Sequence, residues 1–334
     1  VRKALEKIRE IRGGKGYGYR RGLLSSTLRL TRSMSPEIAD TVAECKALIG
    51  HQGPVEVYVT PEHQFNATCY REVKGPTVLT LSSRLLEAFT PAELRFVIGH
   101  ELGHAAFDHY SLPMPLTSMI EELGIPFVSR HVSLKLYAWC RSAELSADRI
   151  GLLCAQDPQA AASGFFKLAS GMASPRVVPD LATFARQVES LASAPEAREK
   201  EYDEDTLDCF STHPYNPVRV RAVWAFSRSE PFLAAMGRPT DDAWSLEDVE
   251  EMVDRDMQLM EPTYLQEKTE NSDTLRRLLY TAGIAVAAAS GGVEASELDA
   301  IGRLLGSDHG EGTVDVARVL DDLDGRIKAA LEVP

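Results

Sequence analysis

The chain has 334 residues, of which 44% are hydrophobic and 25% charged, with a formal net charge of −13, as in a globular protein of about two domains. The acidic balance argues against nucleic-acid binding, and no apolar run reaches the ~18 residues of a transmembrane helix. Five cysteines without a CxxC pair argue against a disulfide scaffold and predict a reducing location, the cytoplasm. The charged first residues predict no signal peptide.

The beginning of the chain is strongly basic. Residues 1–33 hold ten Lys or Arg and two Glu, a net charge of +8, so residues 34–334 sum to −21. We expect residues 1–35 to form a basic N-terminal arm. Such an arm docks on the acidic body, stays solvated, or makes a peripheral contact with a membrane surface.

Two patterns after this arm predict a helix and a small sheet. Ser35-Pro36 is a helix start signal, and residues 36–50 have helical character. Strand-like alternation and turn residues then predict a small antiparallel sheet built from three segments: residues 55–60, 65–71 and 76–82.

The helix that follows the sheet has a clear beginning. Thr90 suits the N-cap, Pro91 the first helical position and Glu93 the third position of a capping box, and the helix should run to about Asp108. Further helices are predicted at residues 131–156, from Asp157-Pro158 onward, at residues 212–228 and at residues 245–260. The fold class is therefore α+β and mainly helical.

The strongest functional signal on that helix is His100-Glu101-Leu102-Gly103-His104. Residues four apart share one helix face, so the two imidazoles can reach one Zn²⁺ ion. Glu101 can take a proton from water that the metal activates and later return it. The apolar neighbours favour a buried site, in which such polar groups need partners. The alternative is an ordinary exposed helix face.

A catalytic zinc site needs a third protein ligand and an open fourth position. His109 does not fit an HExxHxxGxxH pattern, and we expect it to be a surface histidine on another side of the helix. Glu144 is the better candidate. It shares a helix face with Asp148, which can orient a ligand histidine. Alternatively, both carboxylates are solvated near Arg141 and Arg149.

Three motifs in this order resemble the M48 family of metallopeptidases. They are HExxH at 100–104, ExxxD at 144–148, and His213-Pro214 followed by Arg219. The resemblance covers about residues 40–225 and implies a zincin-like core, which we place at residues 36–237, with the small sheet beside the HExxH helix.

The resemblance also implies roles for individual residues. Glu144 would be the third zinc ligand, His213 would stabilise the oxyanion and Arg219 would support it. Asn66, Ala67 and Thr68 would belong to an edge strand that pairs with an extended peptide. Packing at a helix start is the plain alternative for His213, and a cross-strand role is the alternative for the strand.

Two further segments follow the predicted core. Residues 238–273 are polar and acidic and are predicted to be a linker or lid. Residues 274–334 form a helical block that resembles TerB-like domains at Ala287–Val293 and Glu297, although Ser290 stands where that family usually has Asp. A generic helical appendage is the alternative.

These features together predict a metalloendopeptidase with one Zn²⁺ ion and protein or peptide substrates. Glu101 would be the general base and acid. The competing interpretations are a non-catalytic, zinc-containing binding or chaperone-like module, and a latent peptidase whose basic arm covers an acidic surface.

Overall fold

The computed structural model describes residues 16–71, 75–109, 130–174, 176, 180–193, 209 and 211–261. The chain divides into two compact units, Val1–Glu261 and Pro262–Pro334. The predicted TerB-like block lies wholly outside the described residues, as does the first part of the basic arm. The predicted domain boundaries at 35, 237 and 273 remain predictions.

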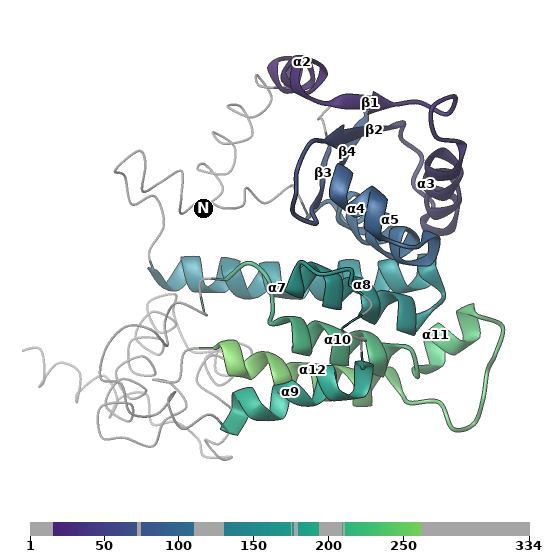
Figure 1. Cartoon of the computed structure of the whole chain (residues 1–334). Coiled ribbons are helices and arrows are strands. Elements are labelled where there is room, and N and C mark those ends of the chain that lie inside the picture. Colours follow the sequence, from purple (N-terminus) through teal and green to yellow (C-terminus); the bar gives the residue numbers. More distant parts are fainter. Residues whose placement is uncertain are drawn as a thin grey trace, which may run out of the picture. The chain divides into compact units, whose positions relative to one another are not determined.

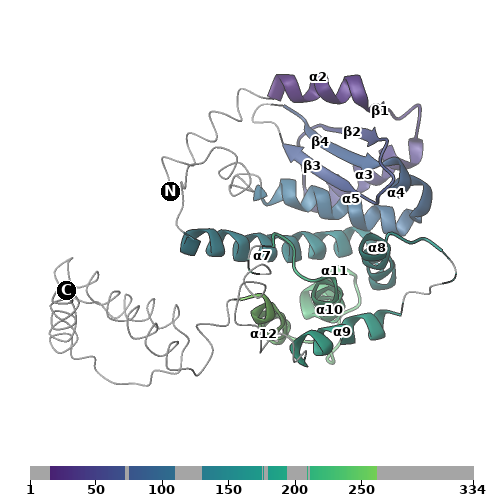
Figure 2. The same cartoon turned by 60° about the vertical axis from the view of Figure 1, so that its left-hand side comes forward.

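A mixed four-stranded sheet forms one side of the described unit, as Figures 1 and 2 show. Its strands are β1 (Leu28–Leu30), β2 (Val55–Thr60), β3 (Ala67–Arg71) and β4 (Thr77–Ser82), in the order β1-β2-β4-β3. The pairs β1–β2 and β3–β4 are antiparallel, whereas β2 and β4 are parallel.

The prediction of a purely antiparallel sheet is therefore wrong. Every residue of β4 is buried, and this strand takes an interior position between β2 and β3. Strand β3, which follows β2 in the chain, lies at the edge of the sheet beside β4. Strand β2 therefore pairs with β4, and these two strands run parallel. Strand β1 lies in the region expected to be a basic arm, as does helix α2 (Gly16–Ser26).

Helix α5 (Pro91–Ala106) lies between the sheet and helix α7 (Arg130–Ala155) in both views (Figures 1 and 2). Its predicted start is confirmed. Thr90 accepts from the backbone N–H of Glu93, and Glu93 accepts from Thr90 N at 2.7 Å. Nearly the whole helix is buried, and Ile98 and Leu102 are fully enclosed. The key helix is therefore a central element of the core.

Helices α5 and α7 pack closely because glycines face the contact. A Cβ on Gly99 would lie 2.6 Å from Cys154 Cβ, and a Cβ on Gly151 would lie 2.7 Å from the carbonyl oxygen of Phe96. A Cβ on a third glycine, Gly103, would lie 3.0 Å from Ile150 Cβ. These contacts fix how α7 is placed along α5, and therefore which side chains face each other across the two helices.

The remaining helices pack around this pair. They are α3 (Pro36–Ile49), α4 (Ser83–Ala88), α8 (Pro158–Ser170), α9 (Leu181–Ser193), α10 (Asn216–Phe226), α11 (Glu230–Ala235) and α12 (Leu246–Met257), followed by the short 3₁₀ helix η4 (Gln258–Met260). The helices expected at 36–50, 131–156, from 157, at 212–228 and at 245–260 are thus present. No helix in the described part of the chain is long and apolar enough to cross a bilayer.

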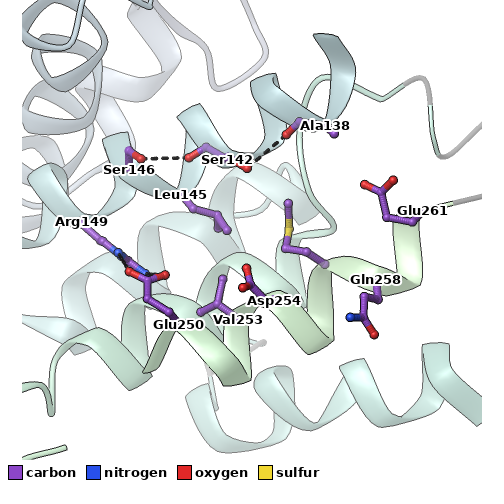
Figure 3. Close-up of a pocket in the computed structure, with 11 residues that line it drawn as sticks. Ala138, Ser142, Leu145, Ser146, Arg149, Glu250, Val253, Asp254, Gln258 and Glu261 are labelled. Atoms are coloured by element: carbon purple, nitrogen blue, oxygen red, sulfur yellow. Dashed lines mark hydrogen bonds and ion pairs between the residues drawn. The ribbon is translucent and has the colours of Figure 1, made fainter. Parts of the chain in front are cut away.

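Helix α12 lies within the segment that was predicted to be an acidic linker or lid. Its Val249 and Val253 are buried in the main core. A groove of about 470 Å³ runs between α12 and the face of α7 that carries Ser142, Ser146 and Arg149 (Figure 3). In that groove Arg149 binds both carboxylate oxygens of Glu250, at 2.6 and 3.0 Å.

Candidate metal centre

Two imidazoles from α5 meet at one point. His100 and His104 are one turn apart, and their Nε2 atoms lie 3.2 Å from each other. Their side chains are 11% and 12% exposed. The exposed helix face that was the alternative for this motif is therefore wrong.

A carboxylate from α7 completes the cluster. Glu144 Oε1 lies 3.3 Å from His104 Nε2, and Oε2 lies 3.5 Å from His100 Nε2. The ligand atoms of the three residues all lie within 4.8 Å of one another. Two helices thus bring a His, His, Glu set together.

A buried ion pair between Arg219 and Asp148 contacts His100 and Glu144 of this cluster. Arg219 of α10 donates from Nε and Nη2 to the two carboxylate oxygens of Asp148, at 2.9 and 2.7 Å. Asp148 Oδ1 lies 2.8 Å from His100 Nδ1, and Arg219 Nη2 lies 3.2 Å from Glu144 Oε2. Burial raises the pKa of Asp148, but the charge and hydrogen bonds of Arg219, together with the hydrogen bond and charge of His100, bring it below its usual value. Asp148 therefore stays ionised and is placed to accept a hydrogen bond from Nδ1–H of His100.

Arg141 and Arg149, the arginines next to these carboxylates in the sequence, have other partners. Arg149 pairs with Glu250, and Arg141 points to the chain before His213. Glu144 and Asp148 are buried, with Asp148 only 1% exposed. The alternative of two solvated carboxylates is therefore wrong.

The donor set fits a divalent metal ion. If Asp148 accepts from Nδ1 of His100, the lone pair of this imidazole lies on Nε2, which faces the cluster. Glu144 Oε2 is buried and accepts no hydrogen bond from the described residues. Two imidazoles and one carboxylate form a typical zinc set that leaves a position for water or substrate.

Glu101 adjoins this cluster without belonging to it. It follows His100 on α5 and is 9% exposed. Burial raises its pKa, although the charges of His100 and His104 act against the shift. A carboxyl group with a raised pKa is suited to accept and return a proton near neutral pH.

His213 reaches the same cluster from the segment before α10. Its Nε2 lies 3.4 Å from Glu144 Oε1, and its side chain is 59% exposed. Thr212 Oγ1 lies 2.8 Å from His213 Nδ1. An imidazole this exposed is not held by packing alone, and the role of His213 stays a prediction.

Arg141 anchors the chain just before His213, which sequence reasoning did not predict. This side chain of α7 is 1% exposed. It donates to the carbonyl oxygens of Cys209 and Ser211 at 2.8 and 3.3 Å, and to Glu261 Oε1 at 2.8 Å. The ExxxD motif alone gives no signal for this anchor.

His109 is not the isolated surface histidine that the helical pattern predicts. Its Nδ1 lies 2.9 Å from His104 Nδ1, and its ring packs against Phe107 and Trp139. The prediction fails because the helix ends at Ala106 and Asp108 turns the chain with a φ of +54°. A left-handed residue of this kind gives almost no sequence signal, although Asp tolerates it better than most residues.

Of the three predicted peptide-binding residues, Ala67 and Thr68 begin strand β3, whereas Asn66 directly precedes it. Among the described residues, β3 pairs only with β4, so it is an edge strand of the sheet as expected. Asn66 N donates to Ser82 Oγ at 3.1 Å, and Thr68 Oγ1 lies 2.6 Å from Thr80 Oγ1. The far end of β3 approaches α5, where Arg71 Nη1 donates to the Ala105 carbonyl at 3.5 Å.

A profile of peptidase family M48 matches residues 32–226, more than half of the chain. The plastoglobule-localized metallopeptidase 48, chloroplastic, of Arabidopsis thaliana is 27% identical over 221 residues, which is 64% of this chain and 64% of that protein. Protease HtpX of Hahella chejuensis and of Acinetobacter baylyi are each 38% identical over 69 residues, 21% of this chain and 23% of the relative.

The chain spans less than two thirds of the length of these curated relatives. No solved structure matches it.

Proposed function

The chain belongs to peptidase family M48, and on this premise we propose that it is a zinc-dependent endopeptidase. The observation that carries the proposal is the convergence of His100, His104 and Glu144 within 4.8 Å, with Glu101 beside them. A cluster that only stabilised the fold would not need a buried glutamate with a raised pKa next to it.

One zinc ion would be held by His100, His104 and Glu144. When bound, it supplies a Lewis acid that polarises the scissile carbonyl and makes water more acidic. Asp148 keeps the His100 ring in the orientation that directs Nε2 to the ion. Arg219 positions both carboxylates through its contacts to Asp148 and Glu144. Its role in this proposal is therefore positioning, not contact with the substrate.

Glu101 is the proposed general base and acid. It would accept the proton of the attacking water and deliver it to the leaving amine nitrogen. Its raised pKa, caused by burial, brings its affinity for a proton closer to that required near neutral pH. Acid–base catalysis of this kind contributes roughly 10²–10⁴-fold to rate.

His213 is the proposed donor to the oxyanion that forms on the substrate carbonyl. Its exposure of 59% leaves the ring accessible to a substrate, while Nε2 stays 3.4 Å from Glu144. Removal of one such donor typically lowers kcat by roughly 10²–10³-fold. The anchor of Arg141 on the preceding carbonyls supports this placement.

An extended peptide is the proposed substrate, bound along β3. In the described part of the chain β3 stands at the edge of the sheet, next to β4. Backbone pairing at such an edge recognises the main chain and little of the sequence. Asn66, Ala67 and Thr68 would make the first of these contacts.

The decisive test compares cleavage of an unfolded protein such as casein by the full chain and by Glu101→Gln, with zinc content measured in both. We expect the variant to retain zinc and to lose cleavage by at least about 10²-fold. Glu87→Gln, which changes an exposed glutamate on α4, is the matched control and should cleave normally.

Each other result has a defined meaning. Robust cleavage by Glu101→Gln would contradict the assignment of the base. Zinc retention by the full chain without any cleavage would instead favour the non-catalytic module or the latent peptidase. Cleavage that appears after removal of residues 1–33 would identify latency.

The cytoplasm is the proposed location of this peptidase. All five cysteines are buried and none is joined in a disulfide, which fits a reducing compartment: Cys45, Cys69, Cys140, Cys154 and Cys209. The Arabidopsis relative is named for a chloroplast location, which makes cell fractionation the necessary check. Recovery of the chain mainly with membranes would contradict this location.

A further inference from the structure

The two histidines of the cluster are held in matching ways on their outer nitrogens. His100 Nδ1 lies 2.8 Å from a carboxylate oxygen of Asp148. His104 Nδ1 lies 2.9 Å from His109 Nδ1. Both Nε2 atoms face the cluster, so each imidazole has its metal-facing nitrogen on one side and a polar partner on the other.

His109 reaches this position through a backbone turn. Helix α5 ends at Ala106, and the exposed Asp108 has a φ of +54°, in the left-handed region. A regular helix would have carried His109 to another side of α5, as the sequence pattern predicts. Non-glycine residues in this conformation are strained and tend to occur at functional sites.

Packing keeps the His109 ring in place. It stacks on Phe107 with a centroid distance of 5.5 Å and meets Trp139 of α7 edge to face at 5.6 Å. The ring is therefore held by one residue of its own turn and one residue of the helix that supplies Glu144. Such packing is typical of a side chain with a defined orientation.

We propose that His109 is the positioning residue of His104: its Nδ1 accepts a hydrogen bond from Nδ1–H of His104 and so keeps the His104 lone pair on Nε2. This inference rests on the proposed function only in taking His104 as a zinc ligand. The physical reason is that a ligand imidazole must be neutral, with its proton on the nitrogen away from the metal. Partners of this kind typically contribute 10–100-fold to metal affinity.

The experiment measures the zinc affinity of the full chain by competition with a chromogenic chelator, with Zn²⁺ as the only added ligand. His109→Phe keeps an aromatic ring beside Phe107 and Trp139 but removes the acceptor. His109→Asn keeps an acceptor oxygen close to the place of Nδ1. We expect zinc affinity to fall about 10–100-fold in His109→Phe and to stay close to wild type in His109→Asn.

A second pair of variants tests the turn without changing the histidine. Asp108→Gly suits a positive φ and should keep wild-type zinc affinity. Asp108→Val places a β-branched residue in that conformation and should weaken zinc binding in the same direction as His109→Phe. His63→Phe, at an exposed histidine, is the control for a general effect of losing an imidazole.

Several results would overturn the inference. If His109→Phe bound zinc with wild-type affinity, the inference would be wrong. If His109→Asn lost as much zinc affinity as His109→Phe, the effect would come from packing and not from the hydrogen bond. If X-ray absorption at the zinc edge showed one imidazole ligand fewer in His109→Phe than in wild type, His109 would itself be a ligand. A wild-type chain that binds no zinc overturns the metal centre together with the proposed function. A chain that binds zinc as expected but cleaves nothing overturns only the proposed function.

Discussion

Gly151→Ala tests the close contact of α5 and α7, on which the metal centre depends. The new Cβ would lie 2.7 Å from the carbonyl oxygen of Phe96 and 3.0 Å from two atoms of its ring. The nearest atom belongs to the backbone of a central helix, so it cannot move away cheaply. The helices must therefore separate by some tenths of an ångström.

The expected loss of stability is the difference between two opposing effects. Alanine is favoured over glycine inside a helix by about 1 kcal/mol. Overpacking of a buried contact costs about 1–3 kcal/mol, and a clash with backbone belongs at the upper end of this range. We therefore expect a net decrease of about 1–2 kcal/mol in the free energy of unfolding.

Gly164→Ala is the matched control for this substitution. Gly164 is also buried inside a helix, α8, but its nearest neighbours would be 3.8 Å from a new Cβ. This variant should be more stable than wild type by up to about 1 kcal/mol. The comparison separates the clash at Gly151 from the intrinsic preference for alanine.

The assay is urea unfolding followed by circular dichroism, with a chelator present so that zinc does not contribute. Zinc affinity is then measured separately, and we expect it to fall in Gly151→Ala because Glu144 moves with α7. If Gly151→Ala proved as stable as wild type while Gly164→Ala gained stability, the close helix contact would not exist as described.

Two further predictions concern buried charged groups. Arg141→Met should release the chain before His213, because it removes the hydrogen bonds to the carbonyls of Cys209 and Ser211. Thiol labelling of Cys209, followed by mass spectrometry of the labelled peptides, should become faster, while zinc affinity stays unchanged. An unchanged labelling rate would refute the anchoring role of Arg141. Glu93→Gln should destabilise the fold by about 3 kcal/mol at neutral pH, because Glu93 is 3% exposed and Lys167 Nζ donates to it at 2.6 Å. Burial raises the pKa of Glu93, but the hydrogen bonds of Lys167 and Ser163 lower it below the usual 4.5. The advantage of wild type should therefore be complete above about pH 4.5 and shrink as the pH falls below it. An advantage in urea unfolding as large at pH 3 as at pH 7 would contradict this.

Local sequence determined the elements that carry the metal centre. Thr90 and Glu93 mark the start of α5 through groups only three residues apart. The spacing of four residues alone places His100 and His104 on one face of their helix. The same spacing places Glu144 and Asp148 on one face of another helix. These predictions succeed because the interacting groups are close in the chain, so the backbone of a regular helix sets their geometry.

Tertiary structure decided which of these faces meet and what supports them. The three glycines set the contact of α5 with α7, and Arg219 and Arg141 bind groups 68 or more residues away in the chain. The parallel pairing of β2 with β4 and the approach of His109 to His104 likewise arise only after packing. Sequence patterns report regular local geometry, whereas a left-handed turn, a buried arginine or a strand order is selected by the energy of the whole core.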